Sequence, residues 1–289
     1  MVDVSSPDGC PIIALADILF SKPQSREAFL NLCTDIVVCR QFSLALTDRV
    51  TRGWEVDEIQ LLGWILSTSR IASITAHLYE SSTVFCQCLT AIGHLPQLAS
   101  EIHAFSRTIL GDPEGYDLMD LLPPLITLAQ LATDERLPFP QRLIWGHLHA
   151  GYYVETLFHA TLLASRTPDL DQEMGAIFAI LRRMGDYAAY PKVLGGLKRE
   201  LDGVSIEQLE EVPTAIEPWS LFLQAYDRGL KAIKLFEDRP SVPFCDYLQC
   251  ALSGKAVDHL GKQCSRCLSV FYCSSECQKR DWAEWHSSE

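Results

Sequence analysis

The sequence predicts a mainly α-helical protein that ends in a small, cysteine-rich module. Three observations lead to this fold class. From Ile12 to Phe236, apolar residues recur at helical spacing, and Pro and Gly separate one apolar pattern from the next. Apolar residues make up 48% of the chain and charged residues 21%, so a sizeable hydrophobic core can form. Six of the 11 cysteines follow Arg239, which sets the C-terminal segment apart.

The helical patterns predict an N-terminal domain built from helices alone. The stretch from Trp54 to Leu78, for example, carries one apolar stripe that neighbouring helices must cover. Pro123-Pro124 is expected to form a turn between helices, and Gly195-Gly196 is expected to interrupt one. Because no fixed period repeats along the chain, we expect an irregular helical array. The expected helices lie at residues 25–47, 55–79, 83–93, 95–110, 117–132, 139–165, 170–185, 188–201 and 214–237.

The longest apolar stretch runs from Leu143 to Ala164 and is long enough to span a bilayer. It contains three histidines and Glu155, which are costly in lipid, so we interpret it as one buried helix and expect no membrane partner. The N-terminus does not resemble a secretory signal, so an intracellular location is expected, in the nucleus or the cytoplasm. With a net charge of −13, the chain lacks the basic surface expected for direct nucleic-acid binding.

The character of the sequence changes near Pro240 and Pro243, which end the last long helix just before the cysteines begin. We therefore expect two parts. Residues 1–240 form an all-helical domain of unknown function, and residues 241–289 form a zinc-binding module.

The module contains seven candidate zinc ligands: Cys245, Cys250, Cys264, Cys267, Cys273, Cys277 and His286. Zinc favours four Cys or His ligands in a tetrahedron, and ligands two to four residues apart let one short turn supply two of them. Cys264 and Cys267 form such a pair, and Cys273 and Cys277 would face one side of a helix that starts there. His286 would face away from Cys277, which suggests two ions with interleaved ligands. A disulfide framework could use the same cysteines, but this spacing in an intracellular protein favours metal.

The same residues resemble the MYND zinc finger. The family pattern has two Cys pairs, an aromatic-Cys-x3-Cys-Gln segment, an Asp-Trp, a His and a closing Cys. The resemblance covers only the last sixth of the chain, and the matching residues are Cys264, Cys267, Tyr272-Cys273, Cys277-Gln278, Asp281-Trp282 and His286. It implies a first zinc site of Cys245, Cys250, Cys273 and Cys277, and a second site of Cys264, Cys267, His286 and a final Cys. The expected cofactor is Zn²⁺, with two ions in the complete module.

Two features depart from the family pattern. Cys245 and Cys250 are separated by four residues instead of the commoner two, so a wider loop must close on the first ion. The pattern would place its closing Cys directly after Glu289, so the module is expected to be truncated before its last ligand. The second site would then have three protein ligands, and would bind metal weakly or complete its shell with water.

MYND modules bind short proline-containing peptides, and the resemblance assigns the peptide contacts to Ser265, Gln278 and Trp282. A Trp face can pack on an extended proline segment while a Gln side chain bonds to the peptide backbone. The alternative is that Trp282 fills the small core of the module, since such domains need every large apolar group for packing.

A second group of residues raises a metal hypothesis in the helical domain. His147, His149 and His159 accompany Glu155 in one apolar stretch. Because the His-Glu-x2-His pattern of metalloproteases is absent, we expect these histidines to lie in the core or at helix flanks. The cysteines outside the module lack metal spacing and are expected to be core thiols; they are Cys10, Cys33, Cys39, Cys86 and Cys88.

The sequence favours a zinc-binding adaptor with protein partners, whose module holds a proline-containing peptide while the acidic helical domain binds or scaffolds another protein. The alternative is an enzyme with an unrecognised active site in the helical domain and an accessory zinc module. We expect no catalytic residues, because the sequence contains no phosphate-binding loop and no hydrolase, kinase or SET methyltransferase motif. A cavity with converging polar groups and shifted pKa values would favour the enzyme.

Overall fold

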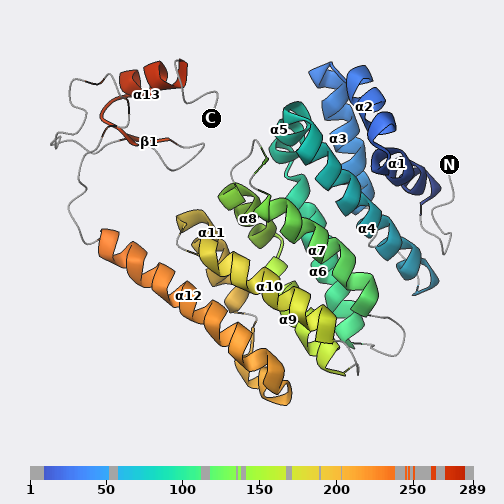
Figure 1. Cartoon of the computed structure of the whole chain (residues 1–289), viewed down its shortest axis with the longest axis vertical. Coiled ribbons are helices and arrows are strands. Elements are labelled where there is room, and N and C mark those ends of the chain that lie inside the picture. Colours follow the sequence, from blue (N-terminus) through green and yellow to red (C-terminus); the bar gives the residue numbers. More distant parts are fainter. Residues whose placement is uncertain are drawn as a thin grey trace. The chain divides into compact units, whose positions relative to one another are not determined.

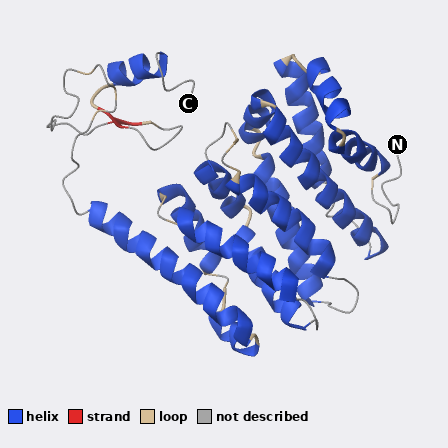
Figure 2. Ribbon diagram, in the orientation of Figure 1, coloured by secondary structure: helices blue, strands red, loops and turns tan. Residues whose placement is uncertain are grey.

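The computed structural model describes residues 10–51, 58–111, 118–134, 136–137, 141–166, 171–188, 190–202, 204–237, 245, 247, 250, 262–264 and 271–283. These residues are mainly α-helical, as the sequence predicts, with one short strand pair towards the C-terminus (Figure 2). The chain divides into two compact units, Met1–Gly229 and Leu230–Glu289, which are described separately below.

The N-terminal unit consists of helices, several of which begin at a proline. Pro11, Pro23 and Pro191 occupy first-turn positions, where the missing backbone N–H has no helical partner to lose. The helices are α1 (Pro11–Ser21), α2 (Pro23–Leu32), α3 (Ile36–Thr51), α4 (Glu58–Ser81), α5 (Thr83–Ala91), α6 (His94–Gly111), α7 (Leu118–Thr133), α8 (Gln141–Ala150), α9 (Tyr153–Arg166), α10 (Asp171–Tyr187), α11 (Pro191–Leu201), the 3₁₀ helix η2 (Ile206–Glu211) and α12 (Pro213–Glu237), which crosses into the C-terminal unit.

The helices of the N-terminal unit fall into successive groups of three, the first of which is α1, α2 and α3. The first helices of these groups, α1, α4, α7 and α10, pack against one another in sequence order (Figure 1). The third helices, α3, α6 and α9, do the same. The middle helices α2, α5, α8 and α11 are short, with 10, 9, 10 and 11 residues. This is the arrangement of an α-solenoid, in which each group packs on its neighbours. The expected helical array therefore has a regular order.

A continuous apolar core runs through the N-terminal unit from Cys10 to Phe222. Trp219 of α12 is fully buried, donates its indole N–H to Thr161 Oγ1 of α9 over 3.2 Å, and meets the Phe158 ring edge-on with centroids 5.5 Å apart. Trp219 thereby ties the first half of α12 to α9.

One buried carboxylate connects three helices of this unit. Glu200 of α11 accepts a hydrogen bond from His149 Nδ1 of α8 over 2.7 Å, and a second from the backbone N–H of Val154 in the first turn of α9. Both side chains are fully buried. A first-turn N–H has no partner within its own helix, so the carboxylate caps α9 from a neighbouring helix.

The prediction of a single helix over residues 139–165 is wrong. The structure has two helices, α8 and α9, which are separated at Gly151 and Tyr152. A Cβ atom on Gly151 would collide with the Pro96 carbonyl oxygen and the Ala99 Cβ of α6, and Tyr152 adopts a left-handed φ of 63°. The apolar pattern continues through this break, so only the contact with α6 reveals it.

Among the described residues, no helix combines the length and apolarity needed to cross a membrane.

The prediction of one helix over residues 25–47 is wrong as well. Helix α2 ends at Leu32, and Asp35 starts a new helix by accepting the N–H of Val37 on its Oδ1 over 2.7 Å. Helix α1, which was not among the expected helices, precedes this pair and buries Ile13 and Phe20.

Two expected interruptions do not occur. Helix α7 continues through Pro123 and Pro124, since buried Leu122 and Leu125 on either side hold it in the core despite the lost N–H donors. Helix α11 continues through Gly195-Gly196. The second glycine serves close packing there, because its backbone lies directly against His149 of α8.

The two adjacent glycines of α11 should respond oppositely to the same substitution. A Cβ on Gly196 would lie 2.5 Å from His149 Cβ, whereas a Cβ on Gly195 would meet nothing within 4 Å. We expect Gly196→Ala to lower the free energy of unfolding by about 1–3 kcal/mol through overpacking. Gly195→Ala should raise it by about 0.5–1 kcal/mol, because alanine restricts the unfolded chain. Denaturation followed by helical circular dichroism measures both, and equal effects would contradict the packing of α11 on α8.

Candidate metal centre

Four cysteines of the C-terminal unit lie together. The Sγ atoms of Cys245, Cys250, Cys273 and Cys277 all fall within 4.8 Å of one another. The Sγ atom of Cys273 is 3.6 Å from that of Cys250 and 3.5 Å from that of Cys277. Two thiolates on one tetrahedral zinc ion are about 3.8 Å apart, given Zn–S bonds of about 2.3 Å. The residues that the resemblance assigns to the first zinc site therefore have a geometry that fits zinc.

Two short elements position the later cysteine pair. Strand β1 (Lys262–Gln263) pairs antiparallel with β2 (Phe271–Tyr272), and Cys273 follows β2 directly. Helix α13 (Ser275–Asp281) begins two residues later, where the Ser274 hydroxyl oxygen accepts the N–H of Cys277 over 3.1 Å. Cys273 thus precedes the helix, and the capped turn brings its Sγ beside that of Cys277.

A buried hydrogen bond fixes α13 against β2. Tyr272 is fully buried and donates its hydroxyl to Oδ2 of Asp281, which is 2.8 Å away and also buried. Tyr272 and Asp281 flank Cys273 and Cys277 in the sequence, so their hydrogen bond limits how far the two cysteines can move apart. Both match positions of the family pattern, but nothing in the sequence indicates that they contact each other, so this support for the site was missed.

Burial and a backbone hydrogen bond position the earlier cysteine pair, Cys245 and Cys250. Cys245 is 1% exposed and Tyr247 is 3% exposed. The Cys250 N–H donates to the Tyr247 carbonyl oxygen over 3.0 Å, which draws Cys250 back toward the start of the pair. The spacing of four residues is therefore compatible with a shared ion.

Burial and mutual proximity favour protonated thiols in the absence of metal. Burial raises the pKa of Cys245. Burial, followed by the neighbouring sulfurs of Cys277 and Cys250, raises the pKa of Cys273 to about 12. A bound divalent cation reverses this preference, because it stabilises the thiolates. Zinc binding therefore releases protons and weakens as the pH falls.

The structure describes the second predicted zinc site only in part. Cys264 directly follows β1 and is 3% exposed. Cys267 and His286 lie outside the described residues, and so does the predicted peptide contact Ser265. The second zinc ion and that contact stay predictions.

The other two predicted peptide contacts lie on one side of α13. The backbone N–H of Trp282 donates to the Gln278 carbonyl oxygen, and this spacing of four residues places both side chains on the same helix face. Both residues are half-buried. Trp282 can therefore pack on the module and still offer part of its ring to a partner.

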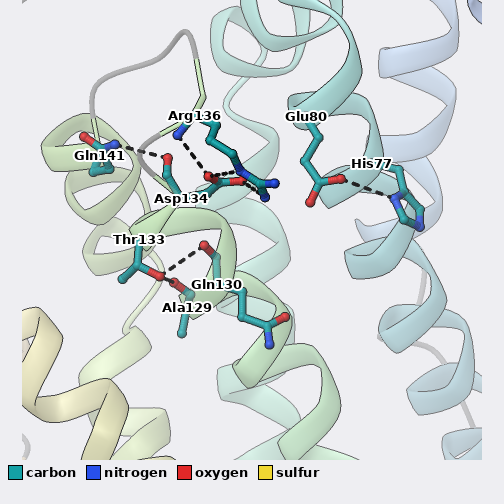
Figure 3. A network of polar contacts seen from close by, with 8 residues as sticks. All are labelled: His77, Glu80, Ala129, Gln130, Thr133, Asp134, Arg136 and Gln141. Carbon is teal, nitrogen blue, oxygen red and sulfur yellow. Dashed lines mark hydrogen bonds and ion pairs between the residues drawn. The ribbon is translucent and has the colours of Figure 1, made fainter.

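The N-terminal unit contains a cavity of about 540 Å³ lined by α4, α7, α8, α10 and the segment after α7. At its edge, Arg136 Nη2 lies 2.8 Å from Asp134 Oδ2, and on α4 His77 Nδ1 lies 3.6 Å from Glu80 Oε2 (Figure 3). The hydrogen bonds from Arg136 lower the pKa of Asp134. The volume falls in the range of ligand-binding cavities.

Comparison with known proteins assigns the last 40 residues of the chain, 250–289. Residues 250–289 match the model of the family described as MYND finger. No curated protein and no solved structure matches this chain. Cys245 precedes the matched range, yet its Sγ atom lies with those of the three cysteines inside it. Residues 250–289 are therefore a MYND zinc finger, and the helical region before it is assigned to no family.

Proposed function

We propose that this protein is a non-catalytic adaptor whose MYND finger holds two zinc ions and recognises short proline-containing segments of partner proteins. MYND fingers generally mediate protein–protein interactions. The observation that carries the proposal is the cysteine tetrad, which holds α13 and its half-buried Trp282 in place.

The chemistry of α13 supports an extended proline segment as the ligand. A proline-rich peptide is already extended before binding, so docking on an aromatic face costs little conformational entropy. Trp282 offers that face, and the Gln278 side-chain amide can both donate to and accept from a peptide backbone. The hydrogen bond between Tyr272 and Asp281 keeps the helix that carries them in one orientation.

The cavity of the N-terminal unit supports a second binding role more than catalysis. Its lining includes small side chains from three helices, such as Ala76 of α4, Ala129 of α7 and Ala176 of α10. The pKa of Asp134 is lowered by a surface arginine, which keeps this carboxylate ionised and makes it a poor proton acceptor near neutral pH. A concave surface across stacked helices is where solenoid proteins hold extended partners.

Replacing one cysteine of the tetrad should remove the first zinc ion. Cys273→Ser deletes the ligand whose sulfur lies nearest to two others, so the full-length protein should carry one zinc ion fewer than the wild type. Native mass spectrometry after brief exposure to a chelator counts the ions. Acidification should release zinc from the wild type, because protons compete for the thiolates.

The matched control is Cys33→Ser, a half-buried cysteine of the N-terminal unit. It should keep the wild-type zinc count, and both variants should keep the helical circular dichroism. A Cys273→Ser protein with an unchanged zinc count would rule out the tetrad as a zinc site.

Replacing the aromatic face should weaken peptide binding without loss of zinc. Trp282→Ala removes the largest proposed contact, and a buried aromatic contact of this kind is worth about 2 kcal/mol or more, which corresponds to ~30-fold in affinity. Fluorescence polarisation with a panel of short proline-containing peptides, each paired with a version in which alanine replaces proline, measures the effect.

Lys279→Ala provides the control, since Lys279 is exposed on the same helix. It should bind the panel as the wild type does. If Trp282→Ala retains both zinc and full peptide affinity, or if no peptide depends on its proline, this mode of recognition is wrong.

A further inference from the structure

The first three-helix group concentrates apolar side chains on its surface. Among the described residues, fifteen large apolar side chains are exposed, and nine of these lie between residues 12 and 44. The nine are Ile12, Leu15, Ile18 and Leu19 of α1, Leu32 at the end of α2, and Ile36, Val37, Val38 and Leu44 of α3. Single exposed apolar side chains are normal on a protein surface, but a group of this size marks an interaction surface.

Helix α1 has an inner face and an outer face, and both are apolar. The inner face packs on α4 and α2, where Ile13 and Phe20 are buried and the Phe20 ring lies 5.0 Å from that of Phe29. The exposed side chains at positions 12, 15, 18 and 19 fall on the opposite side of the helix, given 3.6 residues per turn. Asp17, the only charged residue of α1, lies outside this outer stripe.

Helix α3 is divided in the same way. On its inner face Leu46 is buried and Thr47 Oγ1 lies 2.7 Å from His94 Nδ1 of α6. Val37 and Leu44, which are 56% and 47% exposed, lie two turns apart on the opposite face. Helices α1 and α3 stand first in the two rows of packed helices (Figure 1). In the described part of the chain, their outer faces therefore have no neighbour of the kind that they themselves provide for α4 and α6.

This end of the N-terminal unit is electrically neutral in a strongly acidic chain. Residues 10–51 contain four Lys or Arg and four Asp or Glu, whereas the whole chain has a net charge of −13. Two copies of such a chain repel each other through their net charge, and the repulsion is weakest where each copy is neutral. Helix α1 also contains no Lys or Arg, so it lacks the basic residues with which surface helices bind anionic lipid.

We propose that two copies of this chain form a homodimer in which the outer faces of α1 and α3 meet those of the second copy around a two-fold axis. An uncharged apolar face is complementary to itself, and a two-fold contact between identical faces closes after two copies. Each copy would supply the neighbour that the other copy's first helices lack. The interface lies outside the zinc finger, so its failure would leave the proposed peptide recognition untouched.

The exposed apolar surface has the size that a stable dimer requires. The exposed fractions of the nine side chains together equal about five complete aliphatic residues. At about 100 Å² of apolar surface for each aliphatic side chain, this amounts to roughly 500 Å². A standard interface buries about 800 Å² per partner, of which somewhat more than half is apolar. The nine side chains can therefore provide the apolar share of a standard interface.

Sedimentation velocity of the full-length, zinc-loaded protein tests the proposal. The wild type should pass from monomer to dimer at micromolar concentration or below, as interfaces of this size do. Leu15→Glu places a carboxylate within the outer stripe of α1. Because Leu15 is 58% exposed, the variant should keep the helical circular dichroism and the zinc count of the wild type. Its dimer would hold two carboxylates in an apolar contact, so the dissociation constant should rise at least ~100-fold.

The matched control is Leu221→Glu, since Leu221 of α12 is 56% exposed and lies outside the proposed interface. This variant should dimerise as the wild type does. A wild type that stays monomeric, or a Leu15→Glu protein with the wild-type dissociation constant, would overturn the proposal. Assemblies that grow beyond the dimer, or equal weakening by both substitutions, would indicate head-to-tail packing and would overturn the two-fold arrangement.

Hydrogen–deuterium exchange of the wild type provides a readout that needs no variant. Peptides from α1 should exchange more slowly at concentrations where the dimer forms than at concentrations where the monomer prevails. Peptides from the first half of α12 should exchange equally at both. If Leu15→Glu does not fold, this comparison decides, and exchange of α1 that is independent of concentration would contradict the proposed interface.

Discussion

The carboxylate of Glu200 is the buried group on which the packing of α8, α9 and α11 depends. The break at Gly151 exposes the first N–H groups of α9 inside an apolar core, where an unmet donor is costly. Glu200 accepts one of these N–H groups, that of Val154, on one carboxylate oxygen. Its other oxygen accepts a hydrogen bond from His149. The start of α9 is thereby fixed in rotation, which determines that Glu155 and His159 face α6.

The C-terminal unit is stabilised by a different balance of forces. Its described apolar core consists of Tyr247 and Tyr272 packed among the cysteines. Such a core is too small to hold a fold alone, and metal binding supplies folding free energy directly. The cap at Ser274 and the bond between Tyr272 and Asp281 add local rigidity, but they act on the pair Cys273 and Cys277 and do not reach the earlier pair. A zinc ion shared by the four sulfurs would join the two pairs more firmly than this packing does.

The sequence predicted those features whose cause is local. Helices α5 and α6 begin and end within two residues of expectation, because apolar spacing and helix boundaries agree there. Ligand spacing indicated a zinc-binding module, and the grouping of the tetrad followed from the resemblance to the MYND finger. The break at Gly151 was missed because its cause, the approach of α6, is distant in sequence. For the same reason the approach of His103 on α6 to Glu155 on α9, with Nε2 and Oε2 3.9 Å apart, could not be anticipated from the sequence.

The order of the tetrad along the chain has a consequence for the survival of the finger. An ion shared by Cys250 and Cys273 closes a loop that contains β1 and β2, so it acts as a reversible cross-link in place of a disulfide. Its loss would release the whole loop at once, and the freed backbone would become open to proteolysis as one block. The zinc supply would then set the lifetime of the folded finger.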